Sequence, residues 1–122
     1  MYRYLIGLLL SGLSYAHEMT PTYPVWSPSH VEGILKTEIE MFNKRQDVEW
    51  YEIGVFDEQW NPVPFVTTYK ILNLKYLAHT KFDVYIRSED VYKAEYLCSK
   101  SKLRGLSDNK TMLSSRICSR FK

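Results

Sequence analysis

Apolar side chains recur at every second position in several parts of the chain. Leu35, Thr37, Ile39 and Met41 share one face of such a segment, and the positions between them carry Lys or Glu. A period of two is typical of a β-strand with one face buried against a core. The same alternation places three further sets on predicted inward faces: Tyr51, Ile53 and Val55; Phe82, Val84 and Ile86; and Tyr92, Ala94, Tyr96 and Cys98.

Turn-forming residues separate these segments. Residues 43–47 form a polar turn, residues 57–64 are rich in turn formers, and residues 99–110 form a long polar loop. A short strand is expected around Leu72 and a last strand over residues 112–121. No helical period extends over about eleven residues. About seven short strands at spacings near ten residues predict an all-β fold, a β-sandwich.

The start of the chain has the features of a secretory signal peptide. Arg3 supplies the positive charge, residues 5–13 the apolar run, and residues 14–16 a small-x-small cleavage site. The apolar run is about half of the roughly 20 residues that a membrane span needs. We therefore expect a soluble mature protein that begins at His17, has no transmembrane segment, and is secreted or periplasmic.

The mature part is predicted to contain one domain. Residues 17–30 hold three prolines and no period, which indicates an extended lead-in or at most an edge strand. Residues 31–122 then form the sandwich. A chain of 122 residues with 45% hydrophobic and 25% charged residues has the size and composition of a single folded domain.

Charge is unevenly distributed along the chain. Residues 17–92 contain 7 basic and 12 acidic residues, a net charge of −5, whereas residues 93–122 contain 8 and 2, a net charge of +6. The last strands are therefore predicted to present a basic surface. This surface has four interpretations: it balances acidic groups within the molecule, it is a solubilising face, it meets an acidic partner, or it meets an anionic lipid surface. Export argues against nucleic acid as a partner.

Two cysteines, Cys98 and Cys118, lie in the mature part. An oxidising compartment pairs them if the geometry allows, and the alternative is two separate buried thiols. Closing a loop of about 20 residues would stabilise the fold by roughly 3 kcal/mol in the chain-entropy model.

The run 94–98 has the form A-x-Y-x-C. In immunoglobulin-like sandwiches a Tyr two residues before a cysteine marks the sixth strand, and its hydroxyl bonds the backbone at the corner between strands. Tyr96 is the candidate for this corner, although Tyr96 and Cys98 packing in a core is the alternative. Because Cys118 lies on the last strand, a bridge would join neighbouring strands and fasten the loop between them. The fold is thus predicted to be an immunoglobulin-like β-sandwich of about seven strands.

These features resemble the N-terminal domain of PapD-type periplasmic pilus chaperones. The resemblance rests on the strand 38–43 with its polar turn, on the run 82–87, and on the two cysteines. It implies a disulfide between the last two strands and a client bound by β-strand pairing. The residues implied in partner binding are Arg116 and Arg120, the latter at the place of a residue that anchors a client carboxylate, and the apolar Leu113, Ile117 and Phe121.

The run 17–24, His-Glu-x-Thr-Pro-Thr-Tyr-Pro, is similar to the mature start of small exported proteins of unknown role from marine tailed bacteriophages. This likeness implies a setting and no mechanism.

Copper binding is an alternative function. After cleavage, His17 would offer an α-amine and a ring nitrogen, which suit Cu(II), and Met19 is a soft ligand for Cu(I). At this residue the chain looks like CopC-type copper proteins and lytic polysaccharide monooxygenases. His79 or His30 would have to complete the site. The simpler interpretation is a solvated terminal histidine.

No enzyme is predicted, because the sequence contains no phosphate-binding Gly-rich loop, no G-x-S-x-G, no H-E-x-x-H and no C-x-x-C. A secreted inhibitor that presents residues 99–110 is a third hypothesis. The preferred function is a secreted or periplasmic protein-binding module, chaperone-like, that engages an envelope or surface protein through its last strand.

Overall fold

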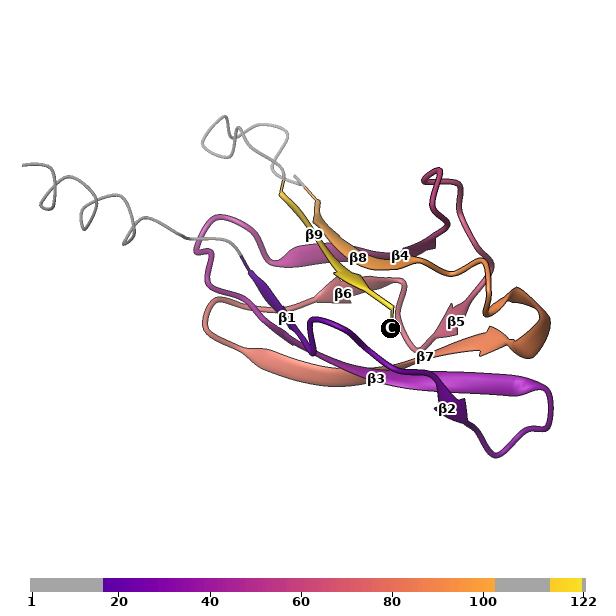
Figure 1. Ribbon diagram of the computed structural model, residues 1–122. Helices are drawn as coiled ribbons and strands as arrows, with labels where there is room; N and C mark the ends of the chain where they lie inside the picture. The colour runs from indigo at the N-terminus through magenta and orange to yellow at the C-terminus, as the bar shows by residue number, and fades with distance from the viewer. Residues whose placement is uncertain (1–16, 103–114, 122) are drawn as a thin grey trace, which may run out of the picture.

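The computed structural model describes residues 17–102 and 115–121. These residues form two antiparallel β-sheets that face each other (Figure 1). The elements in chain order are β1 Glu18–Thr20, β2 Ser27–Pro28, β3 Ile34–Phe42, β4 Trp50–Phe56, β5 Val66–Thr67, β6 Ile71–Asn73, β7 His79–Arg87, the 3-10 turn η1 Ser88–Asp90, β8 Tyr96–Ser101 and β9 Arg116–Arg120. The all-β sandwich is thus confirmed. The described part has nine strands, because four short ones add to the five long ones.

The first sheet has the order β1-β3-β7-β5, and β2 also pairs with β3. Its centre is the long pair β3 and β7, antiparallel over nine residue pairs. This register sets Thr37 opposite Val84 and Ile39 opposite Phe82. Because residues directly opposite each other share a face, the apolar sets predicted for these two strands meet on the inner side.

The second sheet has the order β6-β4-β8-β9. Tyr51, Ile53 and Val55 of β4 are all buried, as their alternation predicts. Their partners on β8 are, in order, Ser101, Ser99 and Leu97.

The inward face of β8 differs from the prediction. The alternation of Tyr96 and Cys98 predicts that they face the core, but Leu97 is the residue that does so, with no exposed surface. The pairing of Val55 with Leu97 turns Leu97 inward and sets Cys98 opposite Gly54 on the outer face of the sheet. Cys98 is nevertheless only 2% exposed, although it points away from the core.

The turn before β8 also differs from the prediction. η1 and the residues after it occupy the place where a strand was expected from Tyr92, whose side chain is 78% exposed. Backbone bonds from Lys93 to Asp90 and from Ala94 to Val91 continue this turn almost to β8. No helix in the described residues is long and apolar enough to cross a membrane.

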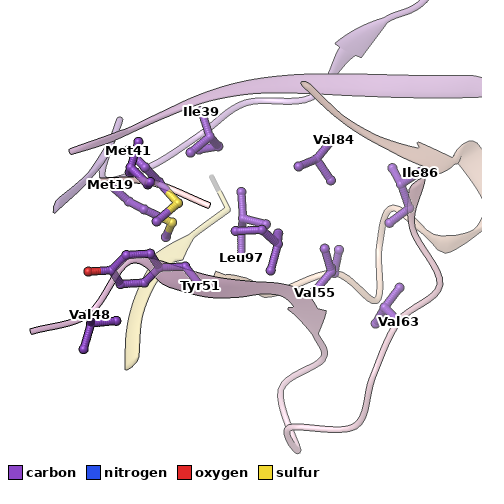
Figure 2. Packing of buried hydrophobic residues seen from close by; sticks show 13 residues of the cluster. Met19, Ile39, Met41, Val48, Tyr51, Val55, Val63, Val84, Ile86 and Leu97 are labelled. Atoms are coloured by element: carbon purple, nitrogen blue, oxygen red, sulfur yellow. The ribbon is translucent and has the colours of Figure 1, made fainter. Parts of the chain in front are cut away.

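The core lies between the two sheets (Figure 2). Met19 and Met41 pack towards Tyr51 at one end, and Val55 and Val63 lie at the other. Burial of such side chains is the main favourable contribution to folding.

Residues 17–30, predicted to be an extended lead-in, contribute β1 and β2. Both strands pair with β3 at the edge of the first sheet. Met19 is 6% exposed and belongs to the core cluster. The segment is therefore packed into the sandwich. Both of its short strands pair with β3 on the side that β7 does not occupy.

Candidate functional site

β9 forms one edge of the second sheet and pairs there with β8 alone. Their register is antiparallel over five pairs, from Tyr96 with Arg120 to Lys100 with Arg116. An edge strand presents one row of backbone groups that no neighbouring strand uses. This row makes β9 the candidate site for a partner.

The hydrogen bonds at both ends of β9 show which residues face outward. The carbonyl of Ser115 accepts a bond from the amide of Ser101, and the amide of Phe121 donates to the carbonyl of Glu95. The backbone N–H and C=O groups of odd-numbered residues therefore point towards β8. The amide of Arg120 donates instead to the carbonyl of Thr22, on the other side. Because backbone groups alternate along a strand, the N–H and C=O of even-numbered residues 116 and 118 also point outward.

The N-terminal segment lies close to β9 along β1, and its backbone bonds to one end of this row. Thr22 accepts the bond from Arg120, and Trp26 stacks on Phe121 with ring centroids 4.5 Å apart. Within the described chain, no backbone bond uses the outward groups of Arg116 or Cys118. The open part of the edge is therefore residues 116–118.

A disulfide joins Cys98 of β8 to Cys118 of β9, with Cα atoms 4.0 Å apart. The two residues are direct partners in the strand register. Their backbone groups do not bond each other, because the N–H and C=O of Cys118 point away from β8. In such non-hydrogen-bonded pairs the two side chains are closest to each other. The bridge ties the candidate edge to the middle of the second sheet.

Arg116 and Arg120 flank this bridge on the outer face of the sheet. Arg120 forms an ion pair with Glu95 at 2.7 Å, and this hydrogen-bonded carboxylate raises the pKa of the guanidinium. Arg116 lies over the ring of Trp60, 4.8 Å from its centroid. The basic surface predicted for the last strands is thus partly balanced within the molecule, as the Arg120 pair illustrates.

The apolar residues predicted for partner binding lie on the other face of β9. Ile117 and Phe121 are partly buried and pack against the core of this chain. Their side chains point inward because they lie two residues before and two residues after Ser119. Ser119 is 2% exposed and lies opposite Leu97, which faces the core. Leu113 lies outside the described residues, as do residues 103–110 of the loop proposed for an inhibitor.

Tyr96 does not form the predicted corner. Its ring lies on the outer face and stacks on Trp60, with centroids 4.2 Å apart and planes inclined by 3°. In the described part of the chain, its hydroxyl makes no hydrogen bond to the backbone. The pairing of Tyr96 with Phe56 places it on the outer face, away from the inter-sheet corner.

His17 is buried, which corrects the expectation of a solvated terminal histidine. Its exposed fraction is 1%, its Nε2 lies 2.7 Å from Ser99 Oγ, and its ring lies 4.4 Å from that of Tyr51. Burial lowers the pKa of His17 from 6.5 to about 4, and the charge of Arg45 acts in the same direction. Nδ1 is also buried and has no hydrogen-bond partner in the described structure.

The other residues named for copper lie apart from His17. His79 begins β7 on an exposed site, 3.4 Å from Glu40, and His30 is exposed beyond β2. Met19 is buried in the core. Among the described residues, no group of three or more His, Cys, Asp or Glu side chains is placed to hold a metal ion. Copper binding by His17 stays a prediction.

Sequence reasoning missed Trp60, whose backbone is in the left-handed region at φ 67°. The carboxylate of Asp57 holds the turn by accepting bonds from the amides of Gln59 and Asn61. The turn carries Trp60 over Tyr96 and Arg116, across two strands. The sequence indicated only a turn, from Asp57 and Asn61-Pro62, and a turn signal does not predict where the ring of Trp60 packs.

Comparison with known proteins identifies the fold. No protein-family model and no curated protein matches the sequence. The crystal structure of the E. coli chaperone DraB matches with a TM-score of 0.64 and 15% identity, over 88% of this chain and 53% of DraB. The periplasmic chaperone SfaE matches with a TM-score of 0.53 and 12% identity, over 88% of this chain and 56% of SfaE.

The chain thus spans little more than half the length of these two proteins. At such identities the likeness concerns the fold, and it agrees with the two facing β-sheets described above. The chain is an immunoglobulin-like β-sandwich that resembles the N-terminal domain of PapD-type periplasmic chaperones.

Proposed function

We propose that this protein is an exported, periplasmic or secreted binding module that captures an extended segment of another protein along β9. The partner strand would pair with the outward N–H and C=O groups of residues 116 and 118. Main-chain bonds supply affinity in this mode of recognition, and side-chain contacts supply selectivity.

The observation that carries the proposal is the open backbone row at residues 116–118. The strand is held in place by the Cys98–Cys118 bridge on one side, so little conformational entropy is lost when a partner docks. The fold shared with the chaperones DraB and SfaE supports a chaperone-like role.

Proline at position 116 tests this pairing. Because the amide of Arg116 points outward, Arg116→Pro removes a donor from the open row and leaves the bonds to β8 in place. Arg116→Ala is the matched control, since it removes the same charge and keeps the amide. The probe is a panel of extended peptides with alternating apolar residues, followed by fluorescence anisotropy.

Binding peptides should protect the amides of Arg116 and Cys118 from hydrogen exchange. We expect Arg116→Pro to weaken binding about tenfold or more, the equivalent of about one hydrogen bond, and Arg116→Ala to weaken it much less. Equal affinity of the proline variant and the wild-type protein, or protection on another strand, would contradict pairing at β9.

A further inference from the structure

A pocket of about 410 Å³ opens on the outer face of the second sheet. It lies over the paired residues Gly54 and Cys98, on the side of the sheet away from the core. This volume is in the range of small-molecule sites. The pocket is distinct from the backbone row on the edge of β9, so a ligand bound in it would add a second activity to the proposed strand pairing.

The floor and one wall of the pocket are apolar. Phe56, Phe65 and Pro62 contribute apolar rings to the lining, and Cys98 contributes half of the disulfide. Gly54 leaves room for the ring of Phe56: a Cβ at this position would lie 2.8 Å from the ring. The ring therefore lies over Gly54, and a side chain at this position would displace it.

Three cations also line the pocket: Lys70, Lys100 and Arg116. Within the described residues, none of the three forms an ion pair with a carboxylate. Lys70 lies over the ring of Phe65 at 5.2 Å from its centroid, and Arg116 lies over Trp60. Both are thus held near aromatic faces with their charge unbalanced.

The one acid that lines the pocket, Glu52, offsets only part of this positive charge. Glu52 pairs with Lys102 at 3.4 Å, outside the set. In the strand register Glu52 is opposite Lys100, and Lys100 is opposite Arg116, so two cations are adjacent across β8 and β9. Adjacent like charges favour a bound anion between them.

We propose that this pocket binds an amphipathic anion, an acyl or aryl group that carries a carboxylate or phosphate. The anionic head is held by the adjacent Lys100 and Arg116, Lys70 adds positive charge from the far side of β4, and the apolar body lies on Phe56 and Phe65. A polar ion alone leaves the aromatic floor uncovered, and a neutral apolar molecule leaves the cations unpaired, so both halves of the ligand are needed.

The test is titration of the full mature chain with decanoate and with decyl phosphate, below micelle-forming concentrations. Calorimetry gives the affinity, and amide chemical shifts give the location. We expect one-to-one binding, with the largest shifts at Gly54 and Lys100, and affinity that rises from hexanoate to decanoate. The two head groups distinguish a carboxylate ligand from a phosphate ligand.

Lys70→Gln combined with Lys100→Gln should weaken decanoate binding about tenfold or more. Lys81→Gln is the matched control: it removes a lysine from the exposed side of β7 on the other sheet, and affinity should stay within about twofold. Neither change touches the outward backbone of β9, so peptide binding there is scored separately.

Three results would overturn the proposal. Decanol binding as tightly as decanoate would show that the cations contribute nothing. Inorganic phosphate binding as tightly as decyl phosphate would show the same for the apolar floor. An unchanged affinity in the double variant, with the circular dichroism spectrum unaltered, would place the ligand elsewhere.

Discussion

Three buried polar side chains, His17, Asn43 and Ser99, lie around Tyr51 at the end of the core near the N-terminus. His17 contacts Ser99 and Tyr51, and the Tyr51 hydroxyl donates to Asn43 Oδ1 at 2.5 Å. Burial raises the pKa of Tyr51 to about 12, so the hydroxyl keeps the proton that it donates. Asn43 Nδ2 in turn donates to the carbonyls of Val48 and Leu74, both at 2.8 Å. Single substitutions here are expected to be costly.

We expect stability to fall as pH is lowered from 6.5 to 4, because of His17. Its pKa is about 4 in the folded protein, against about 6.5 in an unfolded chain. Between these values the unfolded chain binds a proton that the folded chain does not, so unfolding becomes easier by about 3 kcal/mol in total. Urea unfolding at pH 7 and pH 4 measures the loss, and His17→Gln should remove most of it. An unchanged pH slope in that variant would assign the loss to other groups.

Asn43→Ala should lower the free energy of unfolding by about 3 kcal/mol, since it leaves two buried carbonyls and one hydroxyl without their partner. Asn43→Asp should be similarly harmful, because it keeps the volume and loses both donors. Asn73→Ala, at an exposed position on β6, is the control and should change stability by less than about 0.5 kcal/mol. Urea unfolding midpoints of the three variants decide the matter, and a mild effect of Asn43→Ala would mean that water replaces the amide.

At the scale of elements, β9 is a short edge strand with a weakly apolar inner face. Its inner face holds Ile117 and the polar Ser119, Phe121 follows directly after it, and its outer edge is mostly unpaired. Its position depends on β8, on the bridge from Cys98, and on the single bond from Arg120 to Thr22. A strand of this kind is a suitable docking edge only if it stays ordered without a partner.

Replacing both cysteines by alanine should therefore affect β9 before the rest of the fold. The chain-entropy model predicts a loss of about 3 kcal/mol for a loop of 20 residues. Amide exchange at Ile117 and Ser119, which bond to β8, should accelerate more than exchange along β3 and β7. Equal acceleration everywhere would mean that the bridge stabilises the whole sandwich and not this edge. Reduction of the wild-type protein is the parallel measurement.

At the scale of the whole molecule, the N-terminal segment and the last strand close one side of the sandwich together. His17 and Met19 are buried, and Thr22 and Trp26 contact the end of β9. The position of the mature N-terminus therefore bears directly on folding. A start beyond Met19 would remove core side chains and open the edge further.

The exported protein is expected to begin at His17, with both cysteines oxidised. Intact mass spectrometry after export, with and without a thiol-alkylating reagent, tests both points. The expected mass lacks residues 1–16 and does not change on alkylation. A mass that retains Met1 and gains two alkyl groups would contradict export and the bridge together. Reduction before alkylation should add two groups in either case and serves as the control.

Much of the sandwich was predictable from local pattern alone. Ile39, Tyr51 and Val84 are fully buried, as the period of two in β3, β4 and β7 predicts. Each of these strands has one strongly apolar face, and only an orientation that buries this face is stable. The pairing of Cys98 with Cys118 was also within reach, since they are the only two cysteines of the chain.

The tertiary structure decided what the local pattern left ambiguous. On both faces of β8 lie residues that tolerate burial. The register with β4 therefore decides that Leu97, and not Cys98, points towards the core. His17 is neutral and buried only because Ser99 and Tyr51, far along the chain, meet it. The open groups of residue 116 and the pocket over Gly54 likewise depend on which strands are neighbours. Sequence determines local alternation because it reflects each strand's own two faces, whereas edges, pockets and buried polar contacts arise from pairing between distant segments, which no local pattern encodes.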